Sequence, residues 1–537
     1  MEYSFFYDET EHSRKINIQT VTADNYYDNF STAIIGWKKE NEDIIIKQYE
    51  AFEEKYTYRK KNGELKSQTM KQKDLKYGFA TLNNHTIGFY EDLLLTFNQN
   101  TVTYISIFSK VEYLIQQVFR DYHNSFFVDI DCMKYSIIKA ILVYHPCKVM
   151  EAMYRKPEDF VDELRAFFVE RICLNEENMV LKERENIAFK QILLLLDSVE
   201  PIISIDWEYY ASFNGFAKLL QEMNIKHYDL IIDEEGDLHS TLKAAEKEGL
   251  VNLKEANSQE YVGIRMADMF IGLISKVMQS LKKALTNDYA NERIEKTLLE
   301  PGWFILDDRQ LGLYKKLYQI ICVDNKYWYS TYSGIYSDDL VVFIALLQFM
   351  SQFENAEALR NENYDILPEH FNAFVCQALQ ERYAVMGNKL PIEFVQNAGD
   401  DFFLNQRGAK VFYDESRQPL LPIAKGKNVY KVLSIGFGNT GTPSRTFRLR
   451  NFFRGEDGSG TGDGIFAGEY SPCQLRTVDP GGIFRSYVVH GIRTSHGEKG
   501  RQHVHAGGQR CDDRLHLFCH YGTGGDFCGG RGYRESP

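Results

Sequence analysis

The sequence predicts an α/β protein with a mixed β-sheet, a long helical insertion and a helical C-terminal region. Short apolar segments near the start and again near residue 230 have the composition of buried strands. From about residue 125 to 225 the apolar residues recur at helical spacing, for example at Phe189, Ile192 and Leu196. At 537 residues the chain is too long for one ordinary core, so two to four domains are expected.

The first predicted strand, Ser4–Tyr7, ends on two carboxylates, Asp8 and Glu9. Burying a carboxylate at the end of an apolar strand costs free energy unless a cation or a proton compensates its charge. Two later acids have the same setting, because Asp233 ends an apolar strand and Asp268 lies early in a strongly apolar helix. We therefore predict that these acids converge on divalent metal. The alternative is that each one caps a strand or a helix, which is a common role of Asp.

The other expected elements follow from periodicity and from the turn residues between them. The expected strands are Lys15–Ile18, Phe30–Trp37, Thr101–Phe108, Asp229–Asp233 and Leu250–Leu253. A helix is expected from Ser240 to Gly249, with the glycine as its C-terminal stop. We divide the chain into a sheet domain at 1–295, a helical accessory region at 296–428 and a tail at 429–537.

A basic stretch runs from Lys55 to Lys76, with eight positive and two negative side chains in a chain of net charge −13. Tyrosines are interleaved with its cations, a mixture that suits phosphate contact and base stacking. The alternative is a solvated loop or helix face. The candidate nucleic-acid contacts are Arg59, Lys60, Lys61 and Lys66, and the stretch also contains Glu64, a possible further metal ligand.

Taken together, Tyr7-Asp8-Glu9-Thr10, Asp233 and Ile264-Arg265-Met266-Ala267-Asp268 resemble a prokaryotic family described as domain of unknown function 3800 (DUF3800), held to be RNase H-like. The resemblance covers about residues 1–290. Three early strands in a meander, the first carrying a terminal Asp, also fit the start of an RNase H-like sheet. Two departures are Thr10, where Ser is usual, and Arg265, where Gln is usual; that arginine is a candidate contact to metal-bound phosphate.

The resemblance implies a nuclease that hydrolyses the phosphodiester bonds of RNA, DNA or a hybrid with two Mg²⁺ or Mn²⁺ ions, about 3.5–4 Å apart. Oxygen ligands suit these hard ions. Asp8 would bridge both ions, and Asp268 together with Asp233 or Glu64 would complete the shells. Glu9 is either an outer group or a solvent-facing carboxylate. Ser109 ends a strand at a place where some RNase H-like enzymes carry an acid.

The tail differs in composition, because nineteen of the 38 glycines follow Asn451. His and Cys are also dense there, but no complete set of zinc ligands is present. Residues 430–435 resemble the opening strand of patatin-like phospholipases, and the match breaks off before any nucleophile elbow. We therefore predict that the tail is disordered and read out of frame, the remnant of a lost lipase module.

The acidic net charge argues against nucleic-acid binding over the whole surface, although a local basic groove remains compatible with it. The apolar runs are too short to span a bilayer, and the N-terminus lacks a basic signal-like region, so we expect a cytoplasmic protein. Besides the nuclease, two hypotheses stay open. One is a catalytically inactive RNase H-like binding module, and the other is a regulatory partner of a lipase encoded in the same frame.

Overall fold

The computed structural model describes residues 2–10, 26–124, 129–201, 204–206, 210–234, 239–286, 297–325 and 327–387, together with six short strands between 412 and 489. The predicted strand Lys15–Ile18 and almost all of the predicted tail lie outside the described residues. The architecture is mixed α/β, as the sequence predicts, and it is built around one six-stranded sheet.

The sheet has the strand order β6-β5-β1-β2-β4-β7. Its strands are β1 (Glu2–Thr10), β2 (Asn29–Lys38), β4 (Thr101–Ser109), β5 (His227–Asp233), β6 (Leu253–Ala256) and β7 (Thr331–Tyr332). Strand β2 is antiparallel to β1 and to β4, whereas β5 is parallel to β1 and β6 is parallel to β5. The carboxyl ends of β1, β4, β5 and β6 therefore lie at the same edge of the sheet.

Four of the expected strands, at 4–7, 30–37, 101–108 and 229–233, fall within β1, β2, β4 and β5. The strand expected at 250–253 begins later, at Leu253. The reason is local backbone conformation, because Gly249 and Asn252 both have positive φ, 74° and 54°. The chain is still turning away from the preceding helix at these residues and pairs with β5 only afterwards.

Helices occupy the β2–β4, β4–β5, β5–β6 and β6–β7 connections of the sheet. The β2–β4 connection contains α2 (Glu42–Lys55), the short strand β3 (Lys76–Phe79) and α3 (Asn84–Leu95). The expected helical insertion contains α5 (Ile130–Tyr144), α6 (Cys147–Arg155), α7 (Phe160–Asn175), α8 (Met179–Leu196) and α9 (Ala211–Glu222), after α4 (Lys110–Val118). The later helices are α10 (Ser240–Lys247), α11 (Val262–Leu285), α12 (Asp308–Tyr318), α13 (Asp338–Ser351), α14 (Ala356–Asn361) and α15 (Leu367–Gly387).

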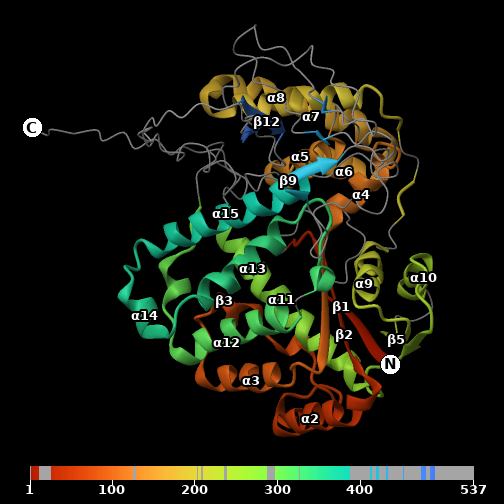
Figure 1. Ribbon diagram of the computed structural model, residues 1–537, viewed down its shortest axis with the longest axis vertical. Coiled ribbons are helices and arrows are strands. Elements are labelled where there is room, and N and C mark those ends of the chain that lie inside the picture. Colours follow the sequence, from red (N-terminus) through yellow and green to blue (C-terminus); the bar gives the residue numbers. More distant parts are fainter. Residues whose placement is uncertain are drawn as a thin grey trace, which may run out of the picture.

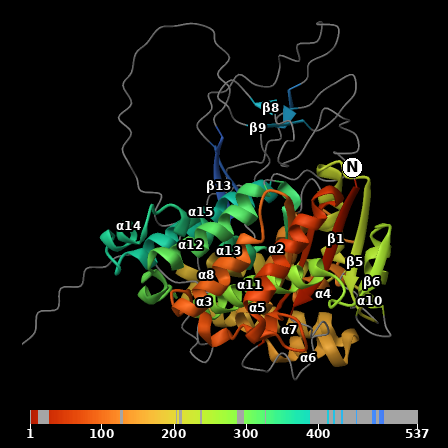
Figure 2. The same cartoon turned by 90° about the horizontal axis from the view of Figure 1, so that it is seen from below.

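The two faces of the sheet are covered by different helices. Side chains alternate along a strand, so Phe6 and Ile35 enter the core that contains α11, whereas Tyr7 and Ile34 enter a second core with α9 and α10. Figure 1 shows α9 and α10 on one side of β1 and β2, with α11 and α13 on the other. In Figure 2, β5, β6 and α10 lie together at the side of the molecule opposite α14.

Helix α11 approaches β1 closely because Gly263 has no side chain. A Cβ at this position would lie 2.1 Å from the Phe6 ring, which neither group could tolerate. Residues from the accessory region complete the same core, since Leu313, Phe343 and Leu379 belong to it, and β7 extends the sheet beside β4. Within the described residues, none of the helices is both long and apolar enough to cross a membrane.

Candidate functional site

Asp8 lies near the carboxyl end of β1 on the α11 face of the sheet, since it alternates with Phe6. Its side chain is buried. Burial raises the pKa of the Asp8 carboxyl well above its usual range, and the negative charges of Asp268 and Asp233 raise it further. The backbone N–H of Glu9 donates to Asp8 Oδ1 at 2.6 Å and opposes the shift. Asp8 is thus a buried acid with other acids around it.

The sheet register places Asp233 beside Asp8. In the parallel pair β1–β5, Tyr7 is the partner of Ile232, so the next residue on each strand is an aspartate. Burial is also the main cause of a raised pKa at Asp233, the charge of Asp268 adds to it, and Lys66 opposes it. Neighbouring parallel strands therefore deliver two of the predicted carboxylates to one place.

Asp268 comes from the second turn of α11. Ser67 binds both oxygens of its carboxylate, through the backbone N–H (2.9 Å to Oδ2) and through Oγ (2.5 Å to Oδ1). Gly272, one turn further along α11, permits this contact, because a Cβ there would lie 2.2 Å from Ser67 Cβ. The pKa of Asp268 is nevertheless raised, first by burial, while the bonds from Ser67 lower it.

Glu64 reaches the site from a tight turn in the basic stretch. Lys61 and Glu64 form an antiparallel β-bridge, and the two residues between them, Asn62 and Gly63, have φ of 54° and 91°. An Asn-Gly pair with positive φ at both positions is the preferred two-residue hairpin connection. The Glu64 side chain is buried, and within the described part of the chain its Oε2 has no hydrogen-bond partner. Its charge raises the pKa of both Asp233 and Asp268, so it belongs to the same cluster.

Lys66 is the cation of this cluster. Its Nζ lies 3.1 Å from Glu64 Oε1 and donates to Ser258 Oγ at 2.9 Å, and its charge lowers the pKa of Asp233 and of Asp268. We call Asp8, Glu64, Asp233, Asp268 and Lys66 the carboxylate cluster. Four acids facing one ammonium group leave an excess of negative charge, which favours bound cations or protons.

Two of the residues predicted for the site point elsewhere. Glu9 lies on the α9 face of the sheet, where the Tyr7 hydroxyl donates to its Oε2 at 2.7 Å. Arg265 is buried and forms a two-fold contact with Glu53, through Nε (2.9 Å) and Nη2 (3.0 Å). Its Nη1 donates to the carbonyl oxygen of Ser258. Arg265 thus anchors α11 to α2, and these bonds engage its guanidinium group.

The other candidate nucleic-acid contacts, Arg59, Lys60 and Lys61, lie at or just before the Asn62-Gly63 turn. The Arg59 guanidinium is 4.4 Å from the centre of the Phe89 ring and bonds His85 Nδ1 at 3.1 Å. Lys60 is partly exposed and Lys61 is exposed. Since Lys61 is bridged to Glu64, this exposed part of the basic stretch lies next to the carboxylate cluster.

The donor chemistry of the cluster suits a hard divalent ion. All four candidate ligands are carboxylates, and Glu64 Oε2 is a buried oxygen still lacking a partner. However, across the described parts of the chain no three His, Cys, Asp or Glu side chains stand close enough to form a ready-made metal site. The acids are close enough to perturb one another, so side-chain rotation would be needed before they could share an ion.

No family model, no curated protein and no solved structure matches this chain. The candidate site is therefore identified from its geometry and chemistry. Sequence reasoning missed Ser67 and Glu53, which no local pattern marks. It also left Glu64 and Asp233 as alternatives, although the Asn62-Gly63 pair signals the turn that brings Glu64 inward.

Proposed function

We propose that the chain is a metal-dependent nuclease that hydrolyses phosphodiester bonds of RNA, DNA or a hybrid of the two. The observation that carries the proposal is the carboxylate cluster, in which four buried or half-buried acids meet with a single lysine. Raised pKa values at Asp8, Asp233 and Asp268 mark acids that a structural ion pair does not neutralise. Such groups gather at functional sites.

The strand arrangement supports an RNase H-like origin and, with it, membership of the DUF3800 family. The antiparallel meander β1–β2–β4 carries Asp8 on its first strand, and β5 with Asp233 is added in parallel on the other side of β1. Helix α11, which carries Asp268, packs against β1. This is the arrangement that the sequence resemblance leads us to expect.

In this proposal Asp8, Asp268, Asp233 and Glu64 hold Mg²⁺ or Mn²⁺, two ions being expected. Divalent ions so held supply an activated water and stabilise the charge on the leaving oxygen. Ser67 fixes the orientation of the Asp268 carboxylate with its two hydrogen bonds. Lys66 limits the repulsion among the acids, and Lys60 and Lys61 meet backbone phosphates beside them.

The test is cleavage of labelled single-stranded, duplex and hybrid substrates by the full chain with Mg²⁺, with Mn²⁺ and with chelator. Asp8→Asn and Asp268→Asn should each reduce cleavage by at least about 100-fold, since even losing an outer partner of a metal ligand costs roughly 10- to 100-fold. Asp229→Asn is the matched control. Asp229 is also on β5, but its side chain is about half exposed and forms an ion pair with Lys39. Cleavage that survives in both cluster variants would refute the proposal.

A second function is favoured by the bonds already made inside the cluster. Lys66 forms an ion pair with Glu64, and Ser67 donates a hydrogen bond to each oxygen of the Asp268 carboxylate. Acids bonded in this way can have a purely structural role. The chain would then be an inactive module that binds nucleic acid or a protein partner. Metal-independent nucleic-acid binding, unchanged in Asp8→Asn and without cleavage, would decide for it. The lipase-partner hypothesis depends on residues 430–435, and of these the structure describes only the two-residue strand Lys431–Val432.

A further inference from the structure

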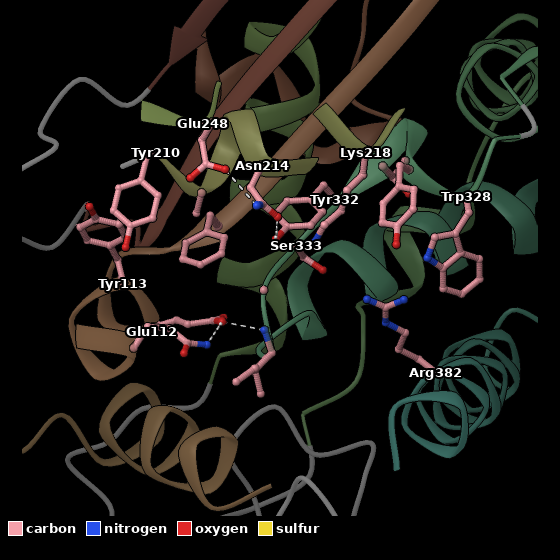
Figure 3. A pocket seen from close by; sticks show the side chains of 17 residues that line it. Glu112, Tyr113, Tyr210, Asn214, Lys218, Glu248, Trp328, Tyr332, Ser333 and Arg382 are labelled. Atoms are coloured by element: carbon pink, nitrogen blue, oxygen red, sulfur yellow. Dashed lines mark hydrogen bonds between the residues drawn. The ribbon is translucent and has the colours of Figure 1, made fainter. Parts of the chain in front are cut away.

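A cavity of about 380 Å³ lies on the face of the sheet opposite the carboxylate cluster. Its wall comes from the end of β4, from α4, α9 and β7, and from Arg382 on α15 (Figure 3). We propose that this cavity binds a mononucleotide, with the phosphate at Arg382 and Lys218 and the base against the aromatic rings at the other end. Neither the carboxylate cluster nor the proposed nuclease activity requires such a site.

The cationic end of the cavity consists of Arg382 and Lys218. Within the described residues Arg382 forms no ion pair, and its Nε lies 3.4 Å from Ser337 Oγ. Its guanidinium is 5.7 Å from the centre of the Trp328 ring, and Lys218 Nζ lies 5.5 Å from that of Tyr332. Burial lowers the pKa of Arg382, and the neighbouring Tyr332 and Tyr329 oppose this shift. A phosphate would supply the missing negative charge through bidentate bonds.

The opposite end of the cavity is aromatic. Tyr113 and Tyr210 meet edge to face, with ring centres 5.6 Å apart, and Phe108 lies behind Tyr113. Figure 3 shows Tyr113 and Tyr210 on one side of the cavity, with Arg382 and Trp328 on the other. Aromatic rings bind the flat faces of bases whatever their sequence. Rings at one end and cations at the other are complementary to a nucleotide, which carries a flat base at one end and a phosphate at the other.

Polar groups near the aromatic end can contact a base edge or a sugar hydroxyl. Asn214 Nδ2 donates to Glu248 Oε2 at 2.9 Å, and the Tyr332 hydroxyl reaches Asn214 Oδ1 at 3.3 Å. The Ser333 Oγ in the wall is buried and has no hydrogen-bond partner among the residues that the structure describes. An unsatisfied hydroxyl of this kind costs stability in an empty cavity, and a bound ligand can satisfy it.

The loop that forms the floor of the cavity is held in place by Glu112. This fully buried carboxylate accepts hydrogen bonds from the backbone N–H groups of Ile335 (2.6 Å) and Tyr336 (2.9 Å). Gly334 makes the approach possible, because a Cβ there would lie 2.0 Å from Glu112 Oε1. The cavity is therefore a preformed pocket, apolar in part and with a few fixed polar groups, as small-ligand sites usually are.

The experiment is calorimetric titration of the full chain, in chelator, with AMP, GMP, CMP and UMP, and in parallel with inorganic phosphate and with adenosine. We expect saturable one-to-one binding of at least one nucleotide, tighter than that of phosphate or adenosine. Arg382→Gln should weaken it at least about 10-fold, because a charged bidentate contact is lost. Trp328→Leu should weaken it less, because it removes a ring beside Arg382 and keeps both cations.

Two matched variants protect this result. Arg309→Gln removes an exposed arginine that pairs with Glu91 away from the cavity, and it should leave nucleotide binding unchanged. Asp8→Asn should also leave it unchanged, which separates the cavity from the carboxylate cluster. Circular dichroism verifies that each variant is folded. The proposal is overturned if no nucleotide binds, if inorganic phosphate binds as tightly, or if folded Arg382→Gln binds like the wild type.

Discussion

Arg265 and Asp268 lie one turn apart on α11, and their charges are balanced to different degrees. Arg265 is matched by Glu53 through two hydrogen bonds and by backbone carbonyl groups. Asp268 receives two hydrogen bonds from Ser67 but faces Asp8, Asp233 and Glu64, and Lys66 is the one cation of the described residues that we find opposing them. The first arrangement satisfies a buried charge within the chain, and the second leaves an excess of negative charge.

The difference teaches how structural and functional buried charges are told apart. A buried ion pair contributes little net stability but is costly to break, so it suits an anchor between α2 and α11. A set of like charges is unfavourable in the empty protein, so it suits a site that a cation or a polar ligand completes. The predictions below test the two arrangements, from the largest expected effect to the smallest.

Glu53→Leu should produce the largest loss of stability. It leaves the Arg265 guanidinium buried without its carboxylate, which typically costs about 3–5 kcal/mol of unfolding free energy. Urea unfolding measures this change. The double variant Glu53→Leu/Arg265→Met should recover most of it, because both charges are then gone. A single variant as stable as the wild type would show that the pair is not an anchor.

Glu112 should make stability depend on pH. Burial raises the pKa of this carboxyl from 4.5 to about 7. Because the folded pKa is the higher one, the contribution of Glu112 is complete below pH 4.5 and is lost as the pH rises through 7. The difference of about 2.5 units corresponds to roughly 3 kcal/mol. Unfolding in urea at pH 5 and at pH 8 should show a smaller difference for Glu112→Gln than for the wild type, and equal differences would contradict the assignment.

Divalent ions should stabilise the wild-type protein and should have little effect on the stability of the cluster variants. With a dissociation constant on the order of 0.1 mM, a concentration of about 10 mM Mg²⁺ adds roughly 2.7 kcal/mol. Thermal unfolding with Mg²⁺ and with chelator measures this effect, and Asp8→Asn should show little of it. In chelator, the same variant should unfold at a higher temperature than the wild type, since it removes one of the repelling charges. A Mg²⁺ shift of the same size in both proteins would place the ion elsewhere.

Ser67→Ala should have a moderate effect. It removes the hydroxyl bond to Asp268 and keeps the backbone one, so the expected cost is about 1 kcal/mol of stability. Loss of an outer partner should also weaken metal affinity roughly 10- to 100-fold. Thr69→Ala is the control, because that hydroxyl binds the Lys66 carbonyl and does not contact the cluster acids. Equal metal affinity in the two variants would show that Ser67 does not contribute to metal binding.

Lys60→Gln and Lys61→Gln should change stability by less than about 0.5 kcal/mol, as exposed substitutions usually do. If these lysines contact phosphates, nucleic-acid binding should depend less on salt in the variants. The slope of log K against log[salt] should become shallower by about one for each lysine replaced. Lys55→Gln serves as the comparison, since Lys55 is already paired with Asp92. An unchanged slope would move the nucleic-acid interface away from this turn.

The sequence by itself determined the mixed α/β class, four of the sheet strands and the helical insertion. It also singled out Asp8, Asp233 and Asp268. These features are local, because strand burial and helical periodicity are recorded in consecutive residues. The acids stood out for the same reason, since each one interrupts an apolar segment at its end or near its start.

Only the tertiary structure decided which charges meet. Glu53 and Arg265 are 212 residues apart, and Ser67 reaches Asp268 across 201 residues. The alternation of side chains sent Glu9 to the face opposite Asp8, although the two residues are neighbours in the chain. The cavity collects residues from Phe108 to Arg382 through the packing of α4, α9, β7 and α15. No local pattern encodes such partners, because they are set by how helices and strands pack together.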